Sequence, residues 1–431
     1  MRMHDDIFCY ASETHIIPQL YNLFRKFPCH PAQVDTVGAY LQRHLTQTMI
    51  EMVRYNVERG ARPGILIFDE DAVEDAVSGI RSFLHEGQCG SRLYSSALEL
   101  IRELLDSRDP RPIKGEKTPG NIFAMANYPE EHRVVPIAVI REPIGTVRSM
   151  QQRNDPYAGA FAGGTERNIG MYMEYAEAVH RCMQNTRSQL VSFEEIAQDP
   201  VRVLTRLHRI FDREPDEHVM RFVEGAPDKE IPVRYNINYR RQKLSANAGD
   251  LTPVDLWKIG NLTKGIREAF NYSDEMLSAL GYNIPTEWPG EELTAAFLPL
   301  SGFYPAEANG NIWMRREGRL IAYLPPKYSN GCSVDLNLWS RFPGEIAGDG
   351  ITLDVFVNGK PKHQFLIQSG PRRSLLSVRL ERYDLKPVGN AGSYAFVELR
   401  SSIAYAPAVI IPNAKDIREI SFVLSDWSLR D

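Results

Sequence analysis

The apolar pattern of this chain changes period once, and that change constrains the fold more than any other feature. Up to about residue 285, segments with helical apolar spacing, such as 34–59 and 91–105, alternate with short apolar runs. Beyond the stretch YNIPTEWPGEE (282–292), short alternating runs follow one another without a long helical segment. The first pattern is typical of an α/β domain, and the second of an antiparallel sandwich or jelly roll. The sequence therefore predicts two domains, residues 1–290 and 291–431.

Individual strands and helices are predicted from the same pattern. In the first half, the sequence predicts strands at 65–68, 134–140 and 189–193 and helices at 167–184 and 200–211. The run VVPIAVI (134–140) is almost continuously apolar, which is typical of a strand buried on both faces of a parallel sheet. In the second half, strands are predicted at 319–324, 333–339, 351–357, 363–368, 375–380, 395–399 and 417–424. Asn358–Gly359 between two of these runs predicts a hairpin.

Charge and cysteine content exclude several classes of function. The formal net charge of −5 argues against a nucleic-acid partner, so any basic site must be local. The 5 cysteines are scattered and have no Cys-x-x-Cys spacing, which favours reduced thiols in the cytoplasm over disulfides or zinc. No apolar run approaches the roughly 20 residues that cross a bilayer, and residues 1–6 have no signal-peptide core. We expect a cytoplasmic protein without a membrane segment.

The segment VVPIAVIREPIGTVRSM (134–150) carries the clearest chemical signal. Arg141 follows the predicted strand, and Pro143 suits the first turn of the next helix. Ligands of open α/β sheets bind at this edge, beside helix N-termini that favour anions. Ser149 lies about two helical turns further on, so the arginine and the hydroxyl are placed to grip one phosphate. The alternative is a local cap or ion pair for Arg141 and a solvated Ser149.

Four segments, in order, resemble the motifs of sulfotransferases that use 3′-phosphoadenosine-5′-phosphosulfate (PAPS). Residues 141–149 resemble the family's 3′-phosphate-binding segment, and KGEKTPGNIF (114–123) resembles its lysine-containing segment. LVSFEEIAQDPVRVLTRLHRIF (190–211) resembles the downstream strand, acidic turn and Asp-Pro-led helix. FCYASETHIIPQL (8–20) resembles the Glu-Thr segment, most closely that of tyrosylprotein sulfotransferases and related bacterial enzymes. The resemblance spans residues 4 to 290 and implies a P-loop-NTPase-like parallel sheet flanked by helices.

The resemblance implies roles for three residues in sulfonate transfer to a hydroxyl. Glu13 matches the general base, and His15 is the alternative because imidazole serves that role in other sulfotransferases. Lys117 matches the cation beside the transferring sulfonate, the alternative being a surface lysine near a turn. Sulfonate transfer of this kind needs no metal, and no cluster of metal-ligating residues is visible in the sequence.

Other residues are implied as contacts of the PAPS nucleotide. Arg141 and Ser149 match the ligands of the 3′-phosphate. Arg240 and Arg241 lie in RYNINYRRQK (234–243), where relatives carry a loop that covers the cofactor; a solvated basic loop is the alternative. Lys258 resembles a late cofactor contact.

One expected motif is missing. The family places a Pro-Arg/Lys-Ser-Gly-Thr-Thr loop around the 5′-phosphosulfate before the Glu-Thr segment, but the residues before Glu13 contain no glycine. A G-x-x-x-x-G-K-[ST] loop is also absent, which disfavours a nucleotide kinase. We expect Met1 to be an internal methionine of a longer reading frame. The alternatives are a chain that has lost the loop and a loop supplied by a partner.

The second half bears on the acceptor. GFYPAEANGNIWMRREGRL (302–320) resembles the start of β-sandwich modules appended to bacterial glycan-modifying enzymes. Phe303, Tyr304, Trp313 and Trp339 are candidates for stacking on sugars, or are core and edge aromatics. The expected function is a PAPS-dependent sulfotransferase that acts on a bacterial cell-surface saccharide or glycolipid. The rival hypothesis is a non-catalytic carbohydrate-binding protein on a sulfotransferase-like scaffold.

Overall fold

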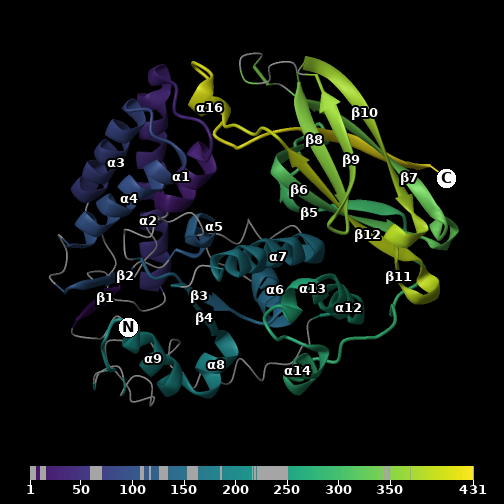
Figure 1. Ribbon diagram of the computed structural model, residues 1–431, viewed down its shortest axis with the longest axis horizontal. Helices are drawn as coiled ribbons and strands as arrows, with labels where there is room; N and C mark the ends of the chain where they lie inside the picture. Colours follow the sequence, from purple (N-terminus) through teal and green to yellow (C-terminus); the bar gives the residue numbers. More distant parts are fainter. Residues whose placement is uncertain are drawn as a thin grey trace.

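A computed structural model of the chain contains a helical half and a β half (Figure 1). It describes residues 6–9, 16–58, 70–106, 111–115, 118–125, 134–152, 164–184, 187–215, 217, 220, 251–340, 342–343, 346, 350–368 and 370–430. None of the helices among these residues is long and apolar enough to cross a membrane. The predicted strand at 65–68 lies outside the described residues.

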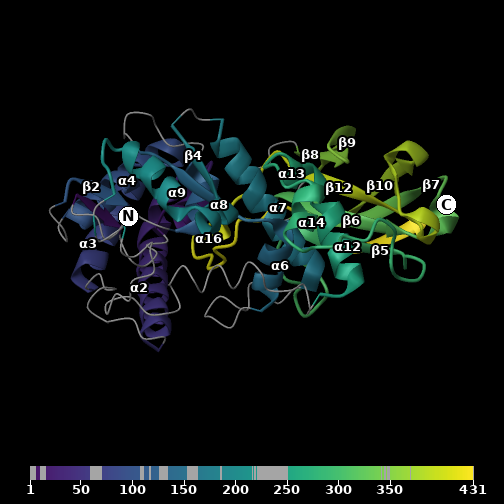
Figure 2. The ribbon, with the colours of Figure 1, turned by 90° about the horizontal axis from the view of Figure 1, so that it is seen from below.

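Helices dominate the first half, and short parallel strands lie between them (Figures 1 and 2). The helices are α1 (Ile16–Phe24), α2 (Val34–Glu58), α3 (Glu70–His85), α4 (Gly90–Asp106), α5 (Ile122–Met125), α6 (Pro143–Gln151), α7 (Gly164–Cys182), α8 (Phe193–Gln198), α9 (Pro200–Arg209), α12 (Pro253–Leu262), α13 (Lys264–Glu268) and α14 (Asp274–Ala279). The strands are β1 (Ile7–Cys9), β2 (Ile113–Gly115), β3 (Ile137–Ile140) and β4 (Gln189–Ser192).

The parallel pairing predicted for this half occurs in two separate pairs. β1 pairs with β2, and β3 pairs with β4, both in parallel register. Among the described residues, the expected P-loop-like sheet is represented by these pairs and not by one continuous sheet. The predicted burial of 134–140 on both faces is wrong, because Val139 is 56% exposed. Side chains alternate along a strand: Ala138 and Ile140 lie in cores on one face, and Ile137 on the other face packs, partly buried, against the core that contains Val203 of α9.

Several helices of this half begin with the same local chemistry. Proline at the first helical position follows a side-chain N-cap at α6, α9 and α12, where Glu142, Asp199 and Thr252 accept backbone N–H groups. Proline needs no N–H partner there and has its φ preset for a helix. At α8, Ser192 and Glu195 form a capping box, and the acidic pair Glu194 and Glu195 lies in the first turn of the helix.

The second half is an antiparallel sheet assembly. Its strands are β5 (Ala296–Phe303), β6 (Ile312–Leu324), β7 (Gly331–Ser340), β8 (Ile351–Val357), β9 (Lys360–Ile367), β10 (Gly370–Glu381), β11 (Lys386–Pro387), β12 (Ser393–Ser401) and β13 (Val423–Arg430). The main path runs β10-β7-β13-β6-β12-β8-β9, with β5 on β6 and β11 on β12. The predicted hairpin is confirmed, since Asn358 and Gly359 have positive φ angles of 49° and 78° between β8 and β9. The strand predicted at 417–424 is displaced to β13, because Ile420 and Phe422 instead fill the core ahead of it.

Both faces of β6 and β12 are buried, which joins the two halves. Ile321, Tyr323, Tyr394 and Phe396 belong to a core shared with α6, α7 and α12. The alternate side chains face the interior of the β half, namely Leu320, Ala322, Leu324, Ala395, Val397 and Leu399. A second junction forms where α16 (Pro407–Ile410) places Val409 in the core of α1, α2 and α4. The helical half and the β half therefore share hydrophobic cores.

Candidate functional site

The sulfotransferase-like segments all follow the carboxyl ends of parallel strands. The last residues of β1 and β2, Cys9 and Gly115, are register partners. The last residues of β3 and β4, Ile140 and Ser192, are also partners. Because the strands of each pair are parallel, the segments that follow them leave from one edge. In open α/β sheets, ligands bind at such an edge.

The residues with predicted roles in sulfonate transfer lie just outside the described residues, but their neighbours are in contact. Glu13, His15 and Lys117 are among the residues that the structure does not describe. A Cβ atom on Gly120 would lie 2.9 Å from Cγ of Pro18. The described chain beside Glu13 and His15 therefore packs against the described chain beside Lys117.

Arg141 lies at the carboxyl end of β3 and is held against two neighbours. Its Cζ is 4.9 Å from the centroid of the Phe193 ring, a cation–π contact between the segments after β3 and β4. Its Nε is 3.5 Å from Oε1 of Glu142, and the side chain is 23% exposed. That Nε is buried and has no hydrogen-bond acceptor. A guanidinium that is fixed, partly open and incompletely satisfied fits the 3′-phosphate of a nucleotide.

Glu142 occupies the N-terminus of α6. Its side chain is 2% exposed, and both carboxylate oxygens accept the Gly145 N–H at 2.8 Å. This helix end was expected to offer free N–H groups to an anion, but the Gly145 N–H is already used by the protein's own carboxylate. A ligand at this edge would therefore meet the guanidinium of Arg141 and not the Gly145 N–H.

A buried set of hydroxyl and carboxylate groups holds the turn between β3 and α6 in place. Tyr282 Oη donates to Oε1 of Glu142 at 3.1 Å. The backbone N–H of Glu142 donates to Glu194 Oε1 at 3.3 Å, and Tyr272 Oη donates to the other oxygen of Glu194 at 2.5 Å. Burial raises the pKa of Glu142 above its ordinary value, and the Gly145 N–H and Arg141 only partly oppose that shift. Two tyrosines distant in sequence thus fix the segment that presents Arg141.

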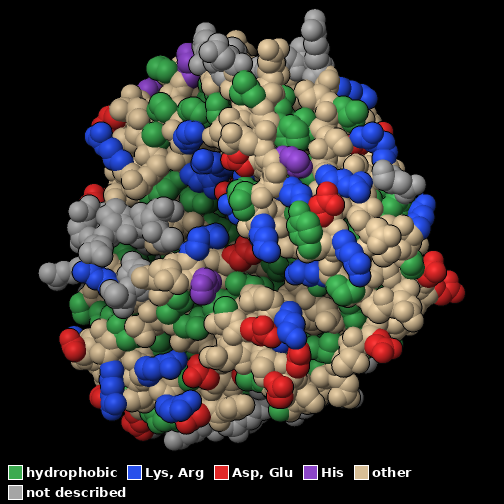
Figure 3. Space-filling view, turned by 45° about the vertical axis from the view of Figure 1, so that its right-hand side comes forward, with side chains coloured by type: hydrophobic (Ala, Val, Ile, Leu, Met, Phe, Trp, Pro, Cys, Tyr) green, Lys and Arg blue, Asp and Glu red, His purple; other side chains and the backbone are tan. Residues whose placement is uncertain are grey.

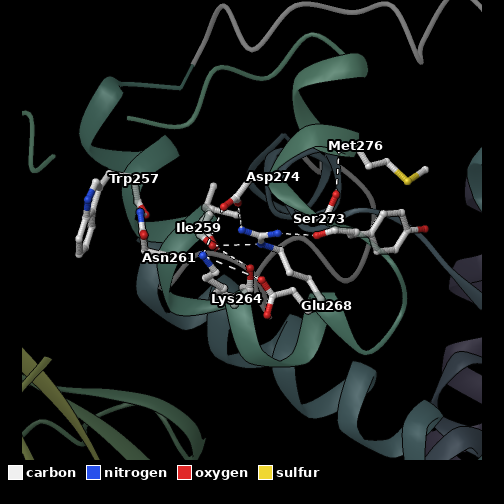
Figure 4. A network of polar contacts seen from close by, with 12 residues as sticks. Trp257, Ile259, Asn261, Lys264, Glu268, Ser273, Asp274 and Met276 are labelled. Atoms are coloured by element: carbon white, nitrogen blue, oxygen red, sulfur yellow. Dashed lines mark hydrogen bonds and ion pairs between the residues drawn. The ribbon is translucent and has the colours of Figure 1, made fainter. Parts of the chain in front are cut away.

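One of these tyrosines, Tyr272, is held in turn by a buried arginine on α13. Arg267 is 1% exposed, and its guanidinium donates to the carbonyl oxygens of Gly260 and Tyr272 and to Asp274. Figure 4 shows Lys264, Glu268 and Asp274 around this point, and Lys264 Nζ lies 3.3 Å from Asp274. Glu142, Tyr272, Tyr282 and Arg267 were not predicted from the sequence. The only sequence signal was an acidic residue directly before Pro143.

The remaining predicted nucleotide contacts lie partly within and partly outside the described residues. Ser149 is exposed on α6, and within the described residues no hydrogen bond joins it to Arg141. Lys258 forms an ion pair with Glu166 at 2.6 Å and lies 5.7 Å from the centroid of the Tyr323 ring. Arg240 and Arg241 lie outside the described residues. The nucleotide-binding roles of these residues stay predictions.

The aromatic side chains at the start of the β half pack against cations and one another. Trp313 and Trp339 lie edge to face with centroids 5.5 Å apart. Arg418 lies 5.5 Å from the Tyr304 ring and 5.7 Å from the Trp313 ring. Trp313 and Tyr304 fit the interpretation as core and edge aromatics better than as open stacking surfaces.

Comparisons with known proteins found structural likenesses only. No family model matches the sequence, and no curated protein matches it. The chain is similar to the sulfotransferase domain from the Synechococcus PCC 7002 olefin synthase, with 13% identity and a TM-score of 0.33 over 62% of this chain and 94% of that one. It is also similar to the sulfotransferase domain from the curacin biosynthetic pathway, with 14% identity and a TM-score of 0.29 over 66% and 100%. A family 35 carbohydrate-binding module from an environmental isolate has 9% identity and a TM-score of 0.18 over 33% and 90%. At these identities and TM-scores, the likenesses assign no function to the chain.

Proposed function

We propose that this protein transfers a sulfonate group from PAPS to a hydroxyl group of an acceptor. The observation that carries the proposal is the common placement of the motif segments. Each follows the carboxyl end of a strand in a parallel pair, and Arg141 is held at one of these ends by Phe193 and Glu142. The contact between Pro18 and Gly120 supports the same arrangement for the segments that contain Glu13 and Lys117.

The proposed chemistry uses the chain's own acid and basic groups. The acceptor hydroxyl oxygen forms a bond to sulfur, and the bond between sulfur and the leaving phosphate oxygen breaks. The Glu13 carboxylate takes the hydroxyl proton, with His15 as the alternative base. The Lys117 ammonium lies beside the sulfonate as charge grows on the leaving adenosine 3′,5′-bisphosphate. Arg141, with Ser149, binds the 3′-phosphate, and Arg240, Arg241 and Lys258 contribute further nucleotide contacts.

The proposed acceptor is a saccharide, on a bacterial cell surface or as a glycolipid. The support is the β half joined to the helical half by shared cores, together with the sequence resemblance of its first segment to glycan-associated modules. A sugar offers the unactivated hydroxyl that the proposed base requires.

Nucleotide binding by the full chain tests the role of Arg141. We expect Arg141→Ala to weaken adenosine 3′,5′-bisphosphate binding about 10- to 100-fold in calorimetry, because it removes a charge-assisted contact. Binding of AMP, which lacks the 3′-phosphate, is expected to change little. Arg209→Ala is the matched control, since Arg209 is an exposed arginine paired with Glu214 at 2.9 Å. A wild-type chain that binds neither nucleotide would contradict the proposal.

Turnover separates the two candidate bases. We expect Glu13→Gln to keep nucleotide binding and to lower sulfonate transfer by about 100-fold or more, because general-base catalysis contributes that order of rate. His15→Asn is the parallel variant and is expected to keep most activity. If His15→Asn abolishes transfer while Glu13→Gln retains it, the base assignment must be exchanged.

A further inference from the structure

The β half presents one aromatic ring to solvent in a defined setting. Tyr383 is 78% exposed and lies in the short helical turn η8 (Arg382–Asp384) between β10 and β11. Most other aromatic side chains of this half are buried or packed against the core. An exposed ring alone is ordinary on a protein surface, so its surroundings decide whether it has a role.

Lys362 fixes the position of the ring. Its Nζ donates to Tyr383 Oη at 3.2 Å and lies over the ring, 4.8 Å from the centroid, as a cation–π contact. The same ammonium donates to Asp384 Oδ2 at 2.6 Å, which anchors it to the buried side of the turn. The ring is thus oriented, and most of its surface stays exposed.

The turn that carries Tyr383 is hydrogen-bonded to neighbouring elements. Asp384 Oδ2 also accepts the Glu381 N–H at 2.8 Å. Asn358, in the β8–β9 hairpin, donates from its side chain to the Asp384 carbonyl at 2.5 Å and accepts the Phe396 N–H at 3.0 Å. The turn, the hairpin and β12 therefore hold Tyr383 as one rigid unit, which lowers the entropy cost of binding to it.

Two further cations belong to the same hairpin and turn as Lys362 and Tyr383. Lys360 and Arg382 are exposed, and within the described part of the chain neither pairs with a carboxylate. Lys386 lies instead over the rings of Tyr394 and Phe396. The nearby carboxylates already form ion pairs, since Asp384 pairs with Lys362 at 2.6 Å and Glu381 with Arg379 at 3.6 Å. The local charge available to a ligand is therefore positive. We call Tyr383, Lys360, Lys362 and Arg382 the Tyr383 platform.

We propose that the Tyr383 platform is a binding site for a sugar residue with an anionic substituent, either sulfate or carboxylate. An aromatic ring packs its face against the C–H face of a sugar, and the peripheral cations complement the anionic group. A single fixed ring with cations on its rim matches one sugar residue. A nucleic acid would need a track of cations, whereas Lys and Arg are interspersed with Asp and Glu on the face in Figure 3. The site is separate from the proposed transfer chemistry, and its occupancy depends on binding alone.

Calorimetry with the full chain tests the platform. The probe is a hexasaccharide of chondroitin 4-sulfate, with cellohexaose as the neutral comparison and hexathymidylate as the nucleic-acid comparison. We expect the sulfated hexasaccharide to bind and Tyr383→Ala to weaken it at least tenfold. Leu375→Ala is the matched control, because Leu375 is 62% exposed on β10 and lies outside the platform. The double variant Lys360→Ala/Arg382→Ala is expected to weaken binding and to reduce its dependence on salt.

Several outcomes would overturn the proposal. They are absence of wild-type binding, equal binding of Tyr383→Ala and wild type, equal or tighter binding of cellohexaose, and equal or tighter binding of hexathymidylate. Far-UV circular dichroism checks that Tyr383→Ala unfolds at the wild-type temperature, as expected for an exposed side chain. Arg141→Ala is expected to keep the hexasaccharide affinity, so failure of the transferase proposal and failure of the platform are distinguishable.

Discussion

At the scale of single residues, Glu142 links the proposed ligand site to the stability of the fold. Its carboxylate caps α6, accepts a hydrogen bond from the Tyr282 hydroxyl and lies beside Arg141. A charge in this position restrains the arginine, because the guanidinium has a partner before any ligand arrives. The cost is a buried carboxylate whose pKa is raised by burial.

This raised pKa predicts a pH dependence of stability. The ordinary pKa of Glu142 is 4.5, and the folded chain keeps the proton at a pH where the unfolded chain has lost it. Stability therefore falls as pH rises from about 4.5 through the folded pKa, by at most about 1.4 kcal/mol per pH unit. We expect Glu142→Gln to flatten this slope in urea unfolding measured at successive pH values. Part of the slope should remain, because burial also raises the pKa of Glu174 and Glu419.

An unchanged slope in Glu142→Gln would contradict the assignment of this proton. Glu287→Gln is a suitable control, because Glu287 is exposed and lies outside the network of Glu142.

The sequence indicated Arg141 as a candidate ligand residue, but it did not indicate the buried groups that hold this arginine in place. Arg141 stands out because it follows an apolar strand and precedes a proline that suits the first turn of a helix. Tyr282 donates to a residue 140 positions earlier, and nothing in the local sequence of either residue reports such a contact. Only the packing of the α13–α14 segment brings the hydroxyl to Glu142.

At the scale of elements, α6 depends on a glycine in its first turn. A Cβ atom on Gly145 would lie 2.1 Å from Glu142 Oε1 and 2.5 Å from Arg141 Nη2. The absence of a side chain therefore lets the carboxylate and the guanidinium fold back over the helix. Pro143 indicated the start of this helix, but this close approach was not predictable, because it depends on rotamers of two neighbours.

We expect Gly145→Ala to displace both groups. The free energy of unfolding should fall by about 1–3 kcal/mol, as for other overpacked sites. If Arg141 binds nucleotide, the affinity for adenosine 3′,5′-bisphosphate should fall about tenfold. Urea unfolding and calorimetry measure the two effects.

Gly265 provides the matched control within another helix. It is an exposed glycine inside α13, and a Cβ there would have no atom within 4 Å. Gly265→Ala is expected to raise the stability by about 0.5–1 kcal/mol, because alanine is the better helix former. Equal effects of the two substitutions would contradict a special role for Gly145.

At the scale of the whole molecule, the change in apolar period marks where the helical half ends and the β half begins. It does not show that the two halves share hydrophobic cores. The nearly continuous apolar runs in β6 and β12 have one face in the β core and one face against α6, α7 and α12. A strand buried on both faces has the same apolar sequence whether the second partner is near or far in the chain. The sharing of cores was therefore not predictable from periodicity.

Shared cores predict cooperative unfolding of the two halves. At the junction, a Cβ atom on Gly170 of α7 would lie 1.9 Å from the backbone carbonyl oxygen of Leu300 in β5. Backbone cannot yield as a flexible side chain can, so Gly170→Ala must separate the helix from the strand. We expect a loss of about 3 kcal/mol in stability. Hydrogen exchange should show protection falling in β5 and β6 as well as in α7, whereas Gly265→Ala should leave both unchanged. Wild-type chains with two separate unfolding transitions, or a loss confined to α7, would show instead that the halves fold independently.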